Sequence, residues 1–181
     1  MQNKVLSTTT RFFHWTSSLL FLGILAFGFY ITQTSDYQWM GLHKSIGALA
    51  IIIFLSRFIW RLHEGFGSLS PVRGFMSLVA AVVHWFLMIA IILMPVSGIM
   101  MSVGSGRGLS IFGLSLIDSS PDPDKSGSFI AVNEQLAYIG HETHELLPWF
   151  ILAILALHII AALKHHFLMK DNALKNMLGI R

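Results

Sequence analysis

The chain has 181 residues, of which 54% are hydrophobic and 12% are charged, with a net charge of +3. Soluble domains carry about 25% charged residues, so this composition excludes an ordinary water-soluble domain and predicts a surface that faces lipid. Cysteine is absent, which excludes disulfides, cysteine-ligated zinc, iron–sulfur clusters and covalently attached haem.

Four apolar stretches follow one another along the chain. Each is close to the length of about 20 residues that a helix needs to cross the hydrocarbon core, and none alternates as a membrane strand does. The predicted spans cover about Phe12–Ile31, Leu42–Leu62, Leu78–Val103 and Leu146–Met169. The sequence therefore predicts an all-α fold, an integral membrane four-helix bundle that forms a single domain over residues 1–181.

Two features of the linkers refine this prediction. The first span is expected to be retained, because its apolar run is longer than that of a typical signal peptide and no small-residue cleavage site follows it. The one long linker, residues 104–145, is rich in Gly, Ser, Pro and Asp and is predicted to be an extramembrane loop.

Lysine and arginine divide unequally between the two sides of the membrane. One side receives Lys4, Arg11, Arg57, Arg61, Arg73, Lys164, Lys170, Lys175 and Arg181, and the other receives Lys44, Arg107 and Lys125. Because cytoplasmic segments carry the excess of basic residues, both termini are predicted to be cytoplasmic and the long loop is predicted to lie outside.

Histidine is unusually frequent, with nine residues in the chain. In the fourth span His144 and His158 differ by about 40° around a helix and by about 21 Å along it, so they share one face near opposite sides of the membrane. His141 matches that face less well. An ionisable group at membrane depth is costly and by default indicates function.

Partners at matching depth lie on the first two spans. His14 opens the first span on the cytoplasmic side, and His43 opens the second on the outer side. The pairs His14 with His158 and His43 with His144 suit two b-type haems, each with two axial histidines. A zinc or copper site would instead gather three or four ligands at one depth. Gly23, Gly28 and Gly47 leave room for a cofactor or, alternatively, for close helix packing.

The remaining histidines leave alternatives open. His84 is a substitute ligand, a hydrogen-bonding group near the inner haem or a packing residue. His165 shares the face of His158 about 10 Å nearer the cytoplasm, beside Lys164 and His166. It is interpreted either as part of a basic interfacial anchor or as a proton donor at a quinone head-group site.

The residues that carry these features resemble the bacterial cytochrome b561 family. The matching segments are Arg11–Trp15, His43–Gly47, Arg57–Arg61, Met94–Gly98, His144–Glu145, His158 and His165–Asn172. The family's His-Glu-Thr at the fourth span is matched literally by His141-Glu142-Thr143, but the spacing to His158 favours His144. The resemblance implies a bacterial inner-membrane protein with two haem b groups, held by His14, His43, His144 and His158.

The resemblance also implies an activity similar to that of a membrane superoxide oxidase, which oxidises superoxide outside and reduces ubiquinone. Lys44, next to His43, is the predicted residue for superoxide capture, although it could simply mark the start of a helix. Two alternatives remain: a haem b electron-transfer subunit that docks a dehydrogenase or hydrogenase, and a non-redox membrane metal-binding or transport module. Membrane lipid, superoxide and ubiquinone are the expected partners, a redox partner protein belongs to the first alternative, and nucleic acid is not expected.

Overall fold

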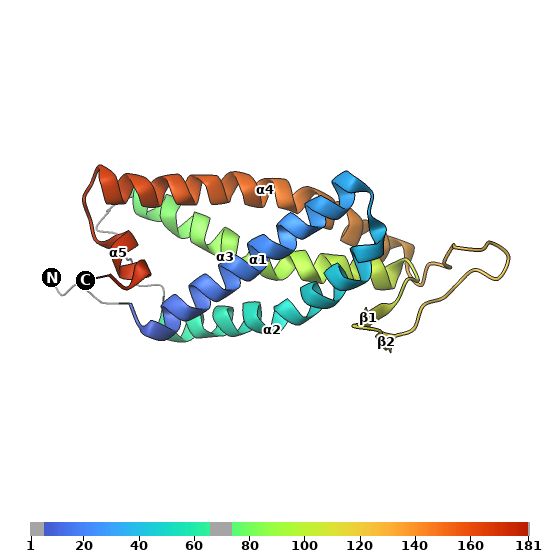
Figure 1. Ribbon diagram of the computed structural model, residues 1–181. Coiled ribbons are helices and arrows are strands. Elements are labelled where there is room, and N and C mark those ends of the chain that lie inside the picture. Colours follow the sequence, from blue (N-terminus) through green and yellow to red (C-terminus); the bar gives the residue numbers. More distant parts are fainter. Residues whose placement is uncertain (1–5, 66–73, 181) are drawn as a thin grey trace.

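Four long helices form an elongated bundle in the computed structural model, which describes residues 6–65 and 74–180 (Figure 1). The helical elements are α1 (Thr8–Thr34), the 3-10 turn η1 (Tyr37–Trp39), α2 (Met40–Glu64), α3 (Phe75–Gly104), α4 (Glu134–Phe167) and α5 (Ala173–Leu178). Helices α1 to α4 have the length and apolar character that crossing a membrane requires. The predicted all-α bundle of four membrane helices is confirmed.

Helix α4 begins well before the predicted fourth span. Asn133 caps it, because its side-chain oxygen accepts a hydrogen bond of 2.9 Å from the amide of Leu136. The helix then continues through Pro148. Residues 134–145, which were expected in the loop, are therefore helical, and His141 and His144 lie within α4 instead of at its start.

The helices pack unevenly against one another. Helix α4 lies along α3, α1 lies along α2, and α2 also contacts α3, whereas contacts of α4 with α1 and α2 are sparse. Gly104 and Gly140 permit the close approach of α3 and α4, since a Cβ at either glycine would collide with backbone atoms of the opposite helix. The helices that carry the partner histidines therefore stand apart from α4.

The buried interior is small, as expected for a bundle that is covered by lipid. Its centre is formed by Phe21, Leu25, Ala50, Phe54, Ala90, Ile91, Met94 and Ile151. Large apolar side chains also point outward along the spans, for example Leu19, Ile52 and Ile160. Water would solvate such a surface poorly, whereas lipid chains match it.

A short β-hairpin extends from the end of α3. Strand β1 (Leu109–Ile111) pairs antiparallel with β2 (Leu114–Ile117). Phe112 and Gly113 both have positive φ, at 48° and 87°, as a two-residue type I′ hairpin turn requires. The amide of Phe112 donates to Ser45 Oγ at 2.9 Å, and this bond fixes the hairpin to the beginning of α2.

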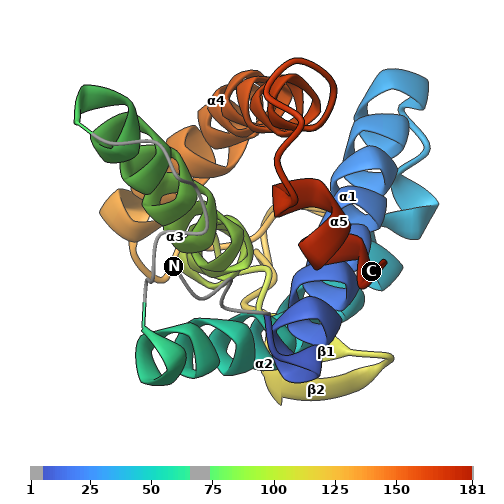
Figure 2. The same cartoon turned by 90° about the vertical axis from the view of Figure 1, so that its left-hand side faces the viewer.

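The two ends of the bundle differ (Figure 1). The hairpin lies at one end, where α2 begins, and α5 lies at the other, where α1 begins. Figure 2 shows α5 beside α1 at that second end. Trp15 on α1 donates to the carbonyl of Met177 on α5 at 3.0 Å. His14 is therefore near the α5 end and His43 near the hairpin end.

Candidate metal centres

Near the hairpin end, the structure places His43 on α2 beside His144 on α4. The centroids of the two imidazole rings are 6.2 Å apart, and their planes are inclined by 79°. A metal ion bonded to both rings at about 2.0–2.1 Å would need a centroid separation of about 6 Å. We call this pair the outer pair. Its separation fits a single metal ion between two imidazoles.

The ring of His144 is held in the tautomer that a metal ligand needs. Its Nδ1 lies 3.0 Å from the carbonyl oxygen of Met94 and 3.1 Å from Ser97 Oγ. Because a carbonyl oxygen only accepts, Nδ1 carries the proton and donates it. The lone pair is thereby left on Nε2, and a ligating histidine commonly has this arrangement.

Two glycines provide space for the outer pair. A Cβ added at Gly28 would lie 3.0 Å from Cε1 of His43, and one added at Gly98 would lie 3.1 Å from Cε1 of His144. His43 Nδ1 is buried and has no hydrogen-bond partner among the described residues. Of the glycines singled out from the sequence, Gly28 contacts a candidate ligand, whereas a Cβ at Gly23 or Gly47 would meet nothing within 4 Å.

His141 lies on a different face of α4 from His144. Its side chain is 56% exposed, and its Nε2 lies 3.6 Å from the carboxylate of Glu145. The literal match to the family's His-Glu-Thr is therefore directed away from His43. His144, which the helical spacing favours, is the histidine of α4 in ring contact with His43.

Near the α5 end the arrangement is less symmetrical. The ring neighbour of His158 on α4 is His84 on α3, with centroids 5.2 Å apart. His84 Nδ1 donates to the carbonyl of Ala80 at 2.6 Å. His14 on α1 is in ring contact with Trp15, and the described side chains show no ring contact between His14 and His158. We call His14, His84 and His158 the inner histidines.

His165 is held by a carboxylate that the sequence prediction missed. Its Nδ1 lies 2.5 Å from Oδ2 of Asp171, in the turn between α4 and α5. The other oxygen of Asp171 accepts from the amide of Ala173 at 3.0 Å and so supports the start of α5. His166 has a buried Nδ1 with no partner among the described residues, and its ring lies against Phe167.

The candidate capture residue Lys44 is drawn toward α3. Its Nζ donates to Ser102 Oγ at 2.9 Å. Ser102 also accepts, through its backbone carbonyl, a 3.0 Å hydrogen bond from the amide of Arg107. Ser102 therefore binds the Lys44 side chain and the Arg107 backbone, while the Arg107 guanidinium is directed to Ser105 and Phe129.

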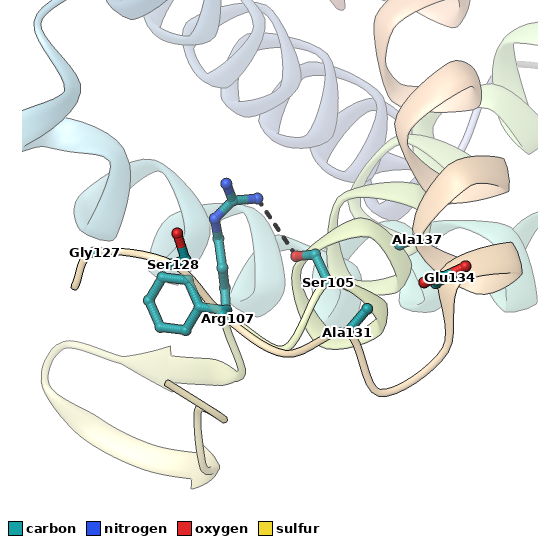
Figure 3. Close-up of a pocket in the computed structure, with 8 residues that line it drawn as sticks. Ser105, Arg107, Gly127, Ser128, Ala131, Glu134 and Ala137 are labelled. Atoms are coloured by element: carbon teal, nitrogen blue, oxygen red, sulfur yellow. Dashed lines mark hydrogen bonds between the residues drawn. The ribbon is translucent and has the colours of Figure 1, made fainter. Parts of the chain in front are cut away.

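A pocket of about 440 Å³ lies at the same end, between the loop and the first turn of α4 (Figure 3). Arg107 lines this pocket and donates a hydrogen bond of 3.4 Å to Ser105 Oγ. Its guanidinium lies over the ring of Phe129 in a cation–π contact. The pocket contains none of the candidate histidines. Among residues 6–65 and 74–180, no group of three or more His, Cys, Asp or Glu side chains could hold a metal ion.

Four helices of membrane-spanning length that bring histidines of different helices together near both ends are the arrangement expected of a membrane cytochrome of the b type, in which haem lies between helices. The chain belongs to the prokaryotic cytochrome b561 family, whose sequence model matches residues 5–179. The family binds b-type haem and transfers electrons in bacterial membranes.

Several curated proteins are similar to the chain over most of its length. Cytochrome b561 homolog 2 of Escherichia coli is 30% identical over 178 residues, which cover 92% of this chain and 87% of that protein. Cytochrome b561 homolog 1 of the same organism is 27% identical, with 97% of both chains covered. A probable superoxide oxidase, CybB, of Yersinia pestis is 29% identical over 79% of this chain and 77% of its own length.

Proposed function

We propose that the chain holds two haem b groups and transfers electrons from superoxide outside the cytoplasm to ubiquinone. The observation that carries the proposal is the placement of His144 and His158 on one face of α4, about 21 Å apart. His43 meets the first of them at a spacing that suits a metal ion. When bound, each haem would supply reversible one-electron exchange, and the two histidine pairs would hold the haems at different depths of the membrane.

The proposed ligands are His43 and His144 at the outer site and His14 and His158 at the inner site. Helix α4 has few contacts with α1 and α2, so the backbones of the helices that bear each pair are not in close contact. At the inner site His84 competes with His14, because its Nδ1 is already committed to a carbonyl and its Nε2 is available. Loss of the inner haem in His14→Ala, with retention in His84→Ala, would favour His14.

Local positive charge supports superoxide as the electron donor. Seven acidic residues on the outer side oppose the approach of an anion at long range. They are Asp36, Asp118, Asp122, Asp124, Glu134, Glu142 and Glu145. Lys44, which follows His43 in the chain, nevertheless donates its Nζ to Ser102 Oγ at the same end of the bundle. Superoxide is an anion, and a local cation raises its concentration where it must react. The relative named as a probable superoxide oxidase supports the same donor.

His165 is proposed to supply protons for quinone reduction at the inner side. Two superoxide ions release two electrons and become two O₂ molecules, and ubiquinone takes up these electrons with two protons to form ubiquinol. Because Asp171 accepts from Nδ1 of His165, Nε2 is left to face a substrate oxygen. In this proposal both termini are cytoplasmic and residues 1–181 act as one domain.

The experiment that tests the proposal uses the purified chain in lipid nanodiscs with a superoxide source and a soluble ubiquinone analogue. We expect one quinol for every two superoxide ions consumed and a spectrum that corresponds to two haems per chain. His144→Ala should abolish quinol formation, and His141→Ala should not. A chain with two haems that does not reduce quinone with superoxide would refute superoxide as the donor.

The β-hairpin favours a second candidate, an electron-transfer subunit that docks a redox partner. Phe112, Leu114 and Leu116 expose 65%, 68% and 55% of their surface at the outer end of the bundle. A contiguous exposed apolar surface commonly marks an interaction site. In that case a reduced partner protein, and not superoxide, would reduce the haems, and Leu114→Ser would slow this step.

A further inference from the structure

Arg57 on α2 is a cation inside the bundle with no paired anion among residues 6–65 and 74–180. Its guanidinium donates to Ser17 Oγ at 2.6 Å, to Ser18 Oγ at 3.3 Å and to His14 Nδ1 at 3.0 Å. Ser17 is fully buried. Among the described residues no carboxylate oxygen lies within the 4.0 Å of an ion pair with Arg57. Charged side chains at membrane depth normally pair, so this arrangement is incomplete.

The contact between Arg57 and His14 cannot persist once His14 binds a metal through Nε2. Arginine is a donor and never an acceptor, so in this contact His14 Nδ1 must carry the lone pair and Nε2 the proton. Ligation through Nε2 requires the reverse, with the proton on Nδ1. His144 at the outer pair already has that reverse arrangement. The inner site must therefore rearrange when it is filled, and Arg57 must release His14.

We propose that Arg57, once released, binds a propionate carboxylate of the haem held at the inner histidines. The group fits because haem b carries two carboxylates, which are the anions that a guanidinium binds best in a low-dielectric site. Arg57 already lies beside His14, so a group bound by this histidine brings its carboxylates into the neighbourhood. A ubiquinone would offer neutral oxygens only and would leave the charge of Arg57 uncompensated.

The proposed assignment rests on the proposed inner haem, but it adds a separate role for a residue that is not a ligand. It also accounts for the two serines. Ser17 and Ser18 can keep one side of the guanidinium hydrogen-bonded while the other side turns from His14 to a carboxylate. Arg57 thus couples haem binding to the tautomer of the axial ligand.

Haem loss from the loaded protein to excess apomyoglobin tests the proposal. The His144→Ala background isolates the inner haem, so that its release is read as one phase. A hydrogen bond to a charged group contributes about 1.5–3 kcal/mol, so Arg57→Gln should speed this release by about tenfold to 150-fold. Arg57→Lys retains the charge without the planar fork and should speed it less. The absorption spectrum should remain that of a bis-histidine haem in all variants.

Haem dimethyl ester, which lacks free carboxylates, is the matched probe. The unsubstituted inner site should lose the ester about as fast as the Arg57→Gln variant loses haem, and the substitution should have no further effect on ester release. Equal acceleration of haem and ester release by Arg57→Gln would overturn the proposal and assign Arg57 a packing role or a direct role on His14. If the native chain holds two haems but Arg57→Gln does not change the rate of haem release, the role of Arg57 is overturned and the proposed function stands. A native chain without an inner haem would refute both.

Discussion

Enlarging Gly28 or Gly98 by one methyl group should weaken the outer haem site while leaving the inner site intact. The added Cβ atoms would lie 3.0 Å from Cε1 of His43 and 3.1 Å from Cε1 of His144, whereas ordinary contacts at a Cβ are 3.4–4 Å. Each ring would have to move by several tenths of an ångström. These rings are the proposed ligands, so the movement acts directly on the metal-binding geometry.

The size of the effect follows from the cost of overpacking. Extra methyl groups in a well-packed interior cost about 1–3 kcal/mol, which corresponds to about fivefold to 150-fold in affinity. Gly98→Ala should lie at the upper end, because His144 is also held by Met94 and Ser97 and cannot easily turn away. Gly28→Ala should cost less, because His43 Nδ1 has no partner to lose among the described residues.

The assay is haem content per chain and the rate of haem loss, measured on the purified membrane protein. Gly41→Ala is a matched control on α2, since a Cβ at this position would meet nothing within 4 Å and Gly41 is not among the glycines expected to make room for a cofactor. This control should retain native haem content. The reasoning is refuted if Gly28→Ala and Gly98→Ala keep two tightly bound haems, or if the control substitution weakens binding as much.

Three further predictions follow from the site and the topology. His144→Ala should leave about one haem per chain, and His141→Ala should leave two, as measured by haem extraction. A reporter enzyme that is active only in the cytoplasm should be silent when inserted near Ser126, because basic residues concentrate on the opposite side. His165→Ala should keep both haems but slow their reoxidation by a quinone analogue about tenfold or more, whereas His166→Ala should not.

Each of these predictions has an outcome that contradicts it. Loss of one haem in His141→Ala would assign the outer ligand to the literal family motif. An active reporter at Ser126 would reverse the topology. Native reoxidation rates in both His165→Ala and His166→Ala would make His165 an interfacial anchor that supports α5 through Asp171.

The fold was largely predictable because apolar run length in a membrane protein is set by bilayer thickness. The four spans were placed from that length alone. The extension of α4 back to Glu134 was not predicted, because the whole segment 104–145 was assigned to a loop on the basis of its Gly, Ser and Pro content. The signal was present in Asn133, a good N-cap residue followed by helix-forming residues. The hairpin was also missed, although Phe112-Gly113 stands between two short alternating segments.

The candidate site was most predictable where one helix determines it, although matching depths also predicted that His43 lies beside His144. The shared face of His144 and His158 depends on helical periodicity, which the sequence contains. Contacts between helices depend on the separation and rotation of the helices, and the sequence does not give these quantities directly. Arg57 was assigned to the cytoplasmic excess of basic residues, yet it reaches His14 across the interface of α1 and α2. Gly98 was noticed as part of a motif, and its contact with His144 emerged from the packing of α3 on α4.

Because α4 carries one proposed ligand for each site, its length between His144 and His158 constrains how this chain can tolerate insertions. One inserted residue would rotate one histidine by about 100° relative to the other and would remove it from its partner. Seven inserted residues would nearly restore the common face but would add about 10 Å to the separation, which α1 and α2 would not match. Residues 145–157 should therefore accept substitutions on their lipid-facing side far more readily than any change in their number.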